Sequence, residues 1–177
     1  DGLVTYGTYV AANASVVCHS PAIHRPVAAV VNATLQVAFN ALHYYAVAPF
    51  QFYDDATISA VSPSSGPIDG GARLRIFGRG LGFGSHHQCW LGGSKVNATA
   101  EYTVYGYEAH CITPPLDASL LHSLGDGNAT LRVALNGQQA SDGTPFALYR
   151  TPTLVELLPD NGDAGTVDDG GVGTLVR

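Results

Sequence analysis

Apolar and polar residues alternate along much of the chain, and helical periodicity is nearly absent. The clearest case is the segment 130–135, in which every second residue is apolar. A β-strand with one buried face shows this period of two. The inward residues of this predicted strand are Leu131, Val133 and Leu135, and the outward residues are Thr130, Arg132 and Ala134.

Turn residues separate several such segments. Leu74 and Ile76 alternate within 73–77, and the hairpin signal Asn136-Gly137 ends the segment 130–135. Phe146 and Leu148 are then predicted on the return strand, after a loop that holds Ser141, Asp142, Gly143 and Pro145. With 21 Gly and 10 Pro in the chain, this pattern predicts an all-β sandwich of about 100 residues per module. A single helical turn, at 118–122, is interpreted as a loop insertion.

The sequence repeats itself with an offset of 96 residues. Residues 32–40 return as 128–136, 49–53 return as 145–149, and 63–66 return in looser form as 159–162. A fixed period of this size indicates an array of similar modules. We therefore expect the later part of one module at 1–55, a complete module at 56–150, and the opening strands of a further module at 151–177.

Composition narrows the class of protein. Charged residues make up 12% of the chain, the net charge is −6, and Lys95 is the single lysine. Nucleic-acid binding needs a basic stripe, so we expect no nucleic-acid partner. The chain lacks the run of about 20 apolar residues that spans a bilayer, so we expect no direct membrane insertion. Residues 1–3 do not resemble the start of a signal peptide, which suggests a processed or internal piece of a longer protein.

Four sequons favour an extracellular or cell-surface location, with N-linked glycans and no other cofactor. Their acceptors are Asn13, Asn32, Asn97 and Asn128. The strand phase places Asn128 on an outward face, and the repeat extends this expectation to Asn32. The three cysteines are Cys18, Cys89 and Cys111. From composition alone, buried free thiols remain an alternative to disulfides.

Several motifs together resemble an IPT/TIG domain, the Ig-like module of plexins, hepatocyte-growth-factor-type receptors and fibrocystin-like proteins. They are the segment 62–71 (SPSSGPIDGG) leading into 73–81 (RLRIFGRGL), then 89–93 (CWLGG), 111–115 (CITPP) and 145–149 (PFALY). The resemblance covers residues 57–150 best. Within it, Gly70 and Gly71 suit a turn that needs positive φ.

This resemblance implies tandem Ig-like β-sandwich modules, one complete and two partial. In extracellular members the two cysteine positions commonly carry a disulfide, which here would join Cys89 to Cys111. Cys18 matches Cys111 in the preceding partial module, so we expect it to be unpaired within this chain, with its partner upstream of residue 1.

Other candidate sites were weighed and set aside. His86 and His87 beside Cys89 suggest zinc, but a structural site needs four ligands and an oxidised Cys89 supplies none. The segment 160–163 has calcium-like acidic residues without a downstream bidentate glutamate and is interpreted as a turn. The glycine-rich segment 78–84 precedes no helix, so it is interpreted as an inter-strand loop. His19 and His110 are expected to be outward strand residues. No catalytic, metal-binding or cofactor-binding residue is expected, and we predict that the chain is not an enzyme.

The favoured function is an extracellular structural glycoprotein whose tandem modules form or decorate a cell-surface fibre. The partners would be copies of itself or adjacent modules of a longer chain. In a head-to-tail assembly, residues near 154–176 would add as strands to residues 16–52 of a neighbour. The stalk or ligand-binding region of a receptor is the alternative. A DNA-binding domain of the Rel type and an accessory module of a starch-active enzyme rank lower.

Overall fold

The computed structural model describes residues 2–23, 30–124 and 127–158. This part of the chain is nearly all β, as the alternation predicted. The strands are β1 (Gly7–Val10), β2 (Ser15–Cys18), β3 (Val31–Val37), β4 (Tyr45–Phe52), β5 (Thr57–Ser62), β6 (Ser65–Pro67), β7 (Arg73–Arg79), β8 (Gln88–Leu91), β9 (Ser94–Asn97), β10 (Thr99–Thr103), β11 (Gly106–Ile112), β12 (Asn128–Ala134) and β13 (Thr144–Tyr149). In these residues no helix is long and apolar enough to cross a membrane.

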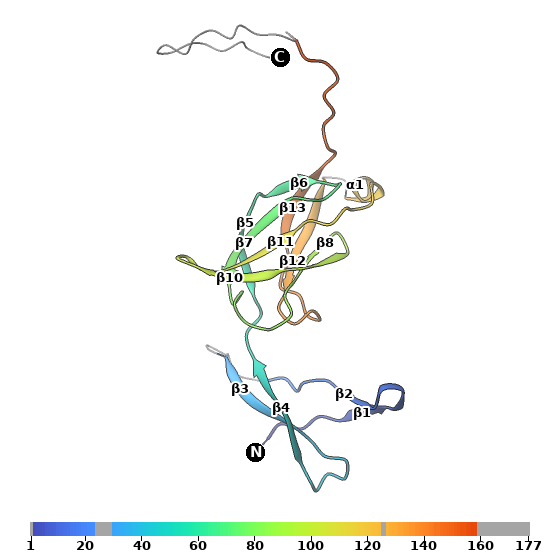
Figure 1. The fold of residues 1–177 in the computed structure, drawn as a ribbon, viewed down its shortest axis with the longest axis vertical. Helices are drawn as coiled ribbons and strands as arrows, with labels where there is room; N and C mark the ends of the chain where they lie inside the picture. The colour runs from blue at the N-terminus through green and yellow to red at the C-terminus, as the bar shows by residue number, and fades with distance from the viewer. Residues whose placement is uncertain (1, 24–29, 125–126, 159–177) are drawn as a thin grey trace.

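Strands β5–β13 form two facing sheets (Figure 1). One sheet has four strands in the order β10-β11-β7-β5, and the other has five in the order β6-β13-β12-β8-β9. All pairs are antiparallel except β6 and β13, which run parallel. This is the Ig-like sandwich that the resemblance implied.

The core lies between the sheets and follows the predicted alternation closely. The most deeply buried large side chains include Phe146, Leu74, Ile76, Leu91 and Leu131. Val133, Leu135 and Leu148 are buried as well. The prediction for Ala134 was wrong, because this residue is fully buried although its position in the alternation is outward. The chain folds back beside it, through a β-bridge between Ala134 and Ala140.

The connection between β12 and β13 differs in detail from the predicted hairpin. Asn136 and Gly137 do form a turn: Gly137 has φ 72°, and the Asn136 Oδ1 accepts the N–H groups of Gln138 and Gln139. The return strand begins only at Thr144, so Pro145 lies in β13 opposite Thr130 and not in the loop.

Two smaller elements match their sequence signals. Gly70 and Gly71 have φ values of 79° and 83°, and a Cβ on Gly70 would lie 2.6 Å from the backbone of Pro114. Glycine is therefore required at Gly70 both by the turn and by the close approach. The helical turn is α1 (Ser119–Ser123), one residue later than expected. The Ser119 N–H donates to Asp117 at 2.8 Å, and the hydrogen bonds from Ser119 lower the pKa of Asp117.

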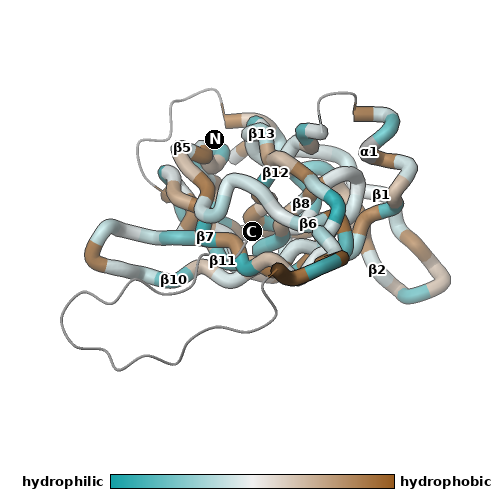
Figure 2. The backbone as a smooth tube through the Cα atoms, turned by 90° about the horizontal axis from the view of Figure 1, so that it is seen from above, coloured by the Kyte–Doolittle hydropathy of each residue, from teal (hydrophilic) through white to brown (hydrophobic). Residues whose placement is uncertain are grey.

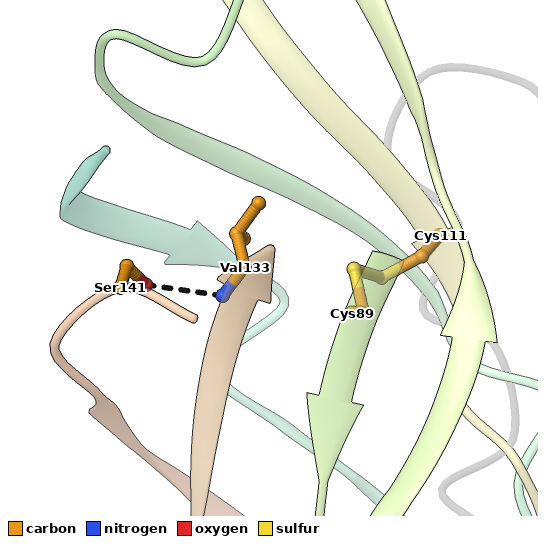
Figure 3. Close-up of a disulfide and its surroundings, with 4 residues drawn as sticks. All are labelled: Cys89, Cys111, Val133 and Ser141. Atoms are coloured by element: carbon orange, nitrogen blue, oxygen red, sulfur yellow. Dashed lines mark hydrogen bonds between the residues drawn. A yellow bond between two sulfur atoms is a disulfide. The ribbon is translucent and has the colours of Figure 1, made fainter. Parts of the chain in front are cut away.

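One disulfide joins the two sheets, as the resemblance implied. Cys89 lies on β8 of the five-stranded sheet and Cys111 on β11 of the four-stranded sheet, with their Cα atoms 6.5 Å apart (Figure 3). Both cysteines are buried among the apolar core residues. Nearby, the N–H of Val133 donates to the buried hydroxyl of Ser141, and the N–H of Ser141 donates to the carbonyl of Val133. These bonds satisfy backbone groups of β12 beyond the last residue that pairs with β13.

The front part of the chain consists of two hairpins, β1–β2 and β3–β4 (Figure 1). The hairpin β3–β4 has the same register as β12–β13. Asn32 faces Gln51 and Leu35 faces Ala48, while Asn128 faces Ala147 and Leu131 faces Thr144. Adding 96 to both residue numbers of a β3–β4 pair gives the corresponding β12–β13 pair. The sequence repeat is therefore a structural repeat of strand pairing.

Burial differs sharply between these matching hairpins. Leu131 and Phe146 are 0% exposed, whereas the corresponding Leu35 and Phe50 are 38% and 39% exposed. No residue described between 2 and 55 is buried. Apolar stretches also run along the exposed β1–β2 hairpin (Figure 2). The front hairpins therefore have strands like those of a module, but no buried core forms around them among the described residues.

The chain enters the sandwich at one end and leaves it at the other (Figure 1). The linker after β4 packs on the sandwich, because Ala56 is buried and the ring of Tyr53 stacks on Phe83 at a centroid distance of 6.2 Å. Burial, then the charge of Asp55, raises the pKa of Tyr53. The chain leaves at the other end through residues 151–158, which are exposed and form no strand (Figure 1). The expected strand around Leu154 is thus absent, and the remainder of 151–177 lies outside the described residues.

We predict that equivalent truncations in the two hairpins differ in cost. Leu131→Ala should lower the free energy of unfolding of the sandwich by about 2–5 kcal/mol, because it opens a cavity in the core. Leu35→Ala should lower it by less than about 1 kcal/mol, because Leu35 packs against no core. Urea unfolding followed by the fluorescence of Trp90 measures both changes. An equal loss of stability in both variants would contradict the conclusion that Leu131 lies in a core and Leu35 does not.

Removal of the disulfide should destabilise the sandwich by about 3 kcal/mol, the loop-entropy value for a separation of 22 residues. The double variant Cys89→Ala/Cys111→Ala tests this in the same urea experiment. Cys18→Ala is the control, since Cys18 is exposed and free. Free thiols at both Cys89 and Cys111 in the unreduced protein would contradict the pairing.

Candidate functional site

The four sequon asparagines all have exposed side chains. Asn128 lies on β12, Asn97 on β9 and Asn32 on β3, while Asn13 lies in the short 3₁₀ turn between β1 and β2. The outward phase expected for Asn32 and Asn128 agrees with this exposure. Attachment of glycans at the four sites stays a prediction.

Asn13 and Asn32 have local hydrogen bonds. The Asn13 Oδ1 accepts the hydroxyl of Ser15, the third residue of its own sequon, at 2.6 Å. The Asn32 Oδ1 accepts the amide of Gln51 from the facing strand at 3.1 Å. Both contacts are exposed to solvent.

The remaining residues singled out from the sequence are not brought together. His87 contacts the carbonyl of Leu81 at 3.2 Å, and His86 bridges to Asn136 before β8 begins. His19 is exposed and follows the end of β2, so the expectation of a strand position was wrong there. The segments 160–163 and 168–169 lie outside the described residues. Residues 2–23, 30–124 and 127–158 hold no group of three His, Cys, Asp or Glu placed to bind a metal ion.

A row of side chains that the sequence analysis missed crosses the outer face of the five-stranded sheet. Trp90 on β8 is directly opposite Lys95 on β9 and directly opposite Arg132 on β12. The ammonium group of Lys95 lies 3.9 Å from the centre of the Trp90 ring. The indole N–H of Trp90 donates to the side-chain carbonyl of Gln88, two residues earlier on β8, at 3.2 Å.

A cavity of about 360 Å³ opens beside this row. It is lined by Trp90, Gly92, Gly93, Lys95, Leu124, Ala129, Thr130 and Arg132. The lining residues that the structure describes include two cations and no carboxylate, although the chain has a net charge of −6. This size falls in the range of small-ligand sites.

Glycines shape both sides of this cavity. A Cβ on Gly143 would lie 2.0 Å from the Thr130 side chain and 3.4 Å from that of Arg132, so the loop before β13 packs closely on both. At Gly93, on the β8–β9 turn, nothing lies within 4 Å of such a Cβ, so the cavity is open there. The loop that contains Gly143 thus lies beside Arg132, and the cavity is open at Gly93.

A second missed cluster lies on the outer face of the four-stranded sheet. Glu108 is 1% exposed, and its carboxylate accepts hydrogen bonds from Arg75 at 2.9–3.2 Å and from Thr103 at 3.1 Å. The Nε2 of His110 is buried without a hydrogen bond, 3.5 Å from the same carboxylate. His110 therefore faces outward as expected, but it is partly covered.

These contacts set the ionisation of Glu108. Desolvation raises its pKa, but the hydrogen bonds from Arg75 and Thr103, together with the charges of Arg75 and His110, outweigh it and hold the pKa below the ordinary 4.5. The cluster is a structural ion pair, because Glu108 is buried and its carboxylate is bonded to Arg75 and Thr103. Its hydrogen-bond donors Arg75 and Thr103 lie on β7 and β10, whereas Glu108 lies on β11, which explains why the sequence gave no signal of their contact.

The lowered pKa of Glu108 predicts a pH dependence of stability. Its stabilising contribution is present above the unfolded-state value of 4.5 and is lost as the pH falls through the lower folded-state pKa. Glu108→Gln should therefore destabilise the sandwich at pH 7, and its difference from the wild type should shrink below pH 4.5. Glu101→Gln is the matched control, because Glu101 is exposed directly opposite Glu108. A difference between Glu108→Gln and the wild type that is constant from pH 7 to pH 3 would contradict the ion pair.

Comparison with known proteins places these features in a family. The family model described as the IPT/TIG domain matches residues 56–148. These are β5–β13, the residues that form the complete sandwich. IPT/TIG domains are non-catalytic Ig-like domains found in receptors and transcription factors.

A solved structure of a candidate phosphatase from Bacteroides thetaiotaomicron is also similar, with 21% sequence identity and a TM-score of 0.35. The match covers 54% of this chain and 18% of that one, so the chain spans less than a fifth of that protein. At this level of similarity its activity says nothing about this chain. The sandwich, its inter-sheet disulfide and the family match over β5–β13 lead to one conclusion: the chain belongs to the IPT/TIG domain family.

Proposed function

We propose that this chain is an extracellular structural glycoprotein segment, built from tandem IPT/TIG modules that pack end to end in a fibre or cell-surface assembly. The observation that carries the proposal is the bare inner face of the front hairpins. The hairpin β3–β4 repeats the register of β12–β13, yet Leu35 and Phe50 lack the cover that Leu131 and Phe146 have. An apolar face of this kind is costly in water and marks an interaction surface.

The complete module indicates what the missing cover is. There β11 pairs with β7, β12 pairs with β8, and β13 pairs with β6. Residues 2–23 and 30–55 contain the counterparts of β10–β13 and none of β5–β9. We infer that strands equivalent to β5–β9, supplied by another segment of a longer chain or in part by a second copy, cover the front hairpins.

Two sources can supply such strands. One is an adjacent module of a longer chain, as in other repeat arrays. The other is a second copy, whose segment 154–176 resembles the opening strands in looser form and would supply counterparts of β5–β7 alone to residues 16–52 by strand addition. Strand addition of this kind is head-to-tail and does not close on itself, so it would extend a filament.

An extracellular setting is supported by two observations. The Cys89–Cys111 disulfide is of a kind that persists in oxidising compartments. All four sequon asparagines are exposed, and glycans on them would add polar cover to a surface poor in charge. The receptor-stalk alternative shares these features and differs in requiring a membrane-anchored precursor.

Assembly can be tested on the full 177-residue chain secreted from a eukaryotic cell. Intact mass before and after N-glycosidase treatment should show carbohydrate at Asn13, Asn32, Asn97 and Asn128. Sedimentation velocity over a concentration series should then show concentration-dependent association. Phe50→Lys should abolish association, because it places a charge on the inner face. Gln51→Lys makes the same change of charge on the outer face of the same strand and should leave association intact.

The outcomes separate the parts of this proposal. A monomer at every concentration would exclude self-assembly and leave the adjacent-module source. That source is tested by adding a second copy of residues 56–98 before residue 1. The added strands should convert Cys18 from a free thiol to a disulfide, and a free Cys18 in this variant would overturn the half-module assignment. Unmodified asparagine at all four sequons would overturn the glycoprotein assignment.

A further inference from the structure

We infer that the cavity beside Trp90 binds a terminal carboxylated sugar, such as the acidic end residue of a glycan on a partner molecule. The inference concerns the outer face of the complete module and does not depend on assembly through the front hairpins. Its basis is the row Lys95, Trp90 and Arg132, which crosses three adjacent strands beside a cavity of about 360 Å³.

The charge of the cavity selects an anion. Among the described residues, its lining has one ammonium and one guanidinium group and no carboxylate. Lys95 is the only lysine of a chain that carries a net charge of −6. Arginine binds carboxylates through paired hydrogen bonds, and the Gly143 loop lies beside the side chain of Arg132. The two cations therefore provide a local site for one carboxylate.

The net charge limits how large this anion can be. A long polyanion or a strongly acidic peptide would be repelled by the other carboxylates of the protein. A single carboxylate at the end of an otherwise neutral ligand experiences mainly the two nearby cations, because salt screens the more distant charges over about 8–10 Å. This argument favours a sugar with one acidic group over a sulfated polysaccharide chain.

The shape and polarity of the cavity favour a sugar ring. Trp90 offers a flat aromatic surface, Leu124 adds an apolar side chain, and Thr130 adds a polar side chain to the lining. The Lys95 ammonium now covers the Trp90 ring at 3.9 Å. A cation–π contact of an exposed lysine is weak, so a carboxylate can draw the ammonium away and uncover the ring for the C–H face of the sugar.

Because Trp90 is the only tryptophan, its fluorescence reports on this cavity alone. We expect 3′-sialyllactose to change that fluorescence saturably, with a dissociation constant on the order of 1 mM. Lactose, which lacks the carboxylate, should give no saturable change. The Asn97→Gln variant should be used, since Asn97 lies on the same outer face as Lys95, two residues further along β9, and N-glycosidase would convert a glycosylated asparagine there to aspartate.

Single charge removals locate the site. Lys95→Gln and Arg132→Gln should each weaken binding about tenfold, the effect of losing one charge-assisted hydrogen bond. Arg73→Gln is the matched control, because Arg73 is exposed on β7 of the other sheet and its replacement changes the net charge equally. Urea unfolding of the three variants confirms that each is folded. A second measurement of binding by calorimetry removes any dependence on the fluorescence of Trp90.

Three results would overturn the inference. The first is an equal response to lactose and 3′-sialyllactose, which would show that the carboxylate is not recognised. The second is equal weakening by Arg73→Gln and Arg132→Gln, which would indicate attraction by overall charge. The third is the lack of saturation at concentrations on the order of 10 mM in both assays. None of these results bears on the front hairpins, so the assembly proposal is tested separately.

Discussion

The closing of one sheet over the other is the constraint on which the rest of the module depends. The inner faces are apolar, and they are joined covalently where Cys89 of β8 meets Cys111 of β11. Once this contact is made, the alternation along each strand decides which residues face outward. Trp90 lies between Cys89 and Leu91, both of which point inward, so its ring must lie on the outer face. Both outer clusters, Lys95–Trp90–Arg132 and Arg75–Glu108–His110, are positioned in this way.

The front hairpins show which properties of a strand pair are local. The register of β3–β4 equals that of β12–β13, because the sequence and the loop of a hairpin fix which residues face each other. Burial is not local, since it requires a second sheet. Leu35 and Leu131 therefore share a pairing position and differ completely in environment. A sequence repeat can thus be read as repeated pairing, but it does not establish that each copy has a core.

The same distinction explains how far sequence reasoning reached. The phase of β12, the turn at Gly70 and the outward position of Asn128 follow from neighbours within a few residues, and these predictions were correct. The disulfide was predicted from the resemblance to a family, because composition alone left buried free thiols as an alternative. Ala134 was misplaced because a distant loop covers it through Ala140. The row through Trp90 went unnoticed because its members are brought together by pairing between strands, although an isolated tryptophan and an isolated lysine five residues apart were a usable signal.

The entry and exit of the chain at opposite ends of the sandwich have a mechanical consequence (Figure 1). Tension applied along a tandem array would enter at β5 and leave at β13. The strand β13 runs parallel to β6, the strand that follows β5, so this load would act along the strands and would shear their hydrogen bonds together instead of opening them one by one. The covalent link between Cys89 and Cys111 would also prevent the 21 residues between them from lengthening the chain if the module gave way. Each module would therefore resist stretching first by shear and then by a fixed limit on its extension.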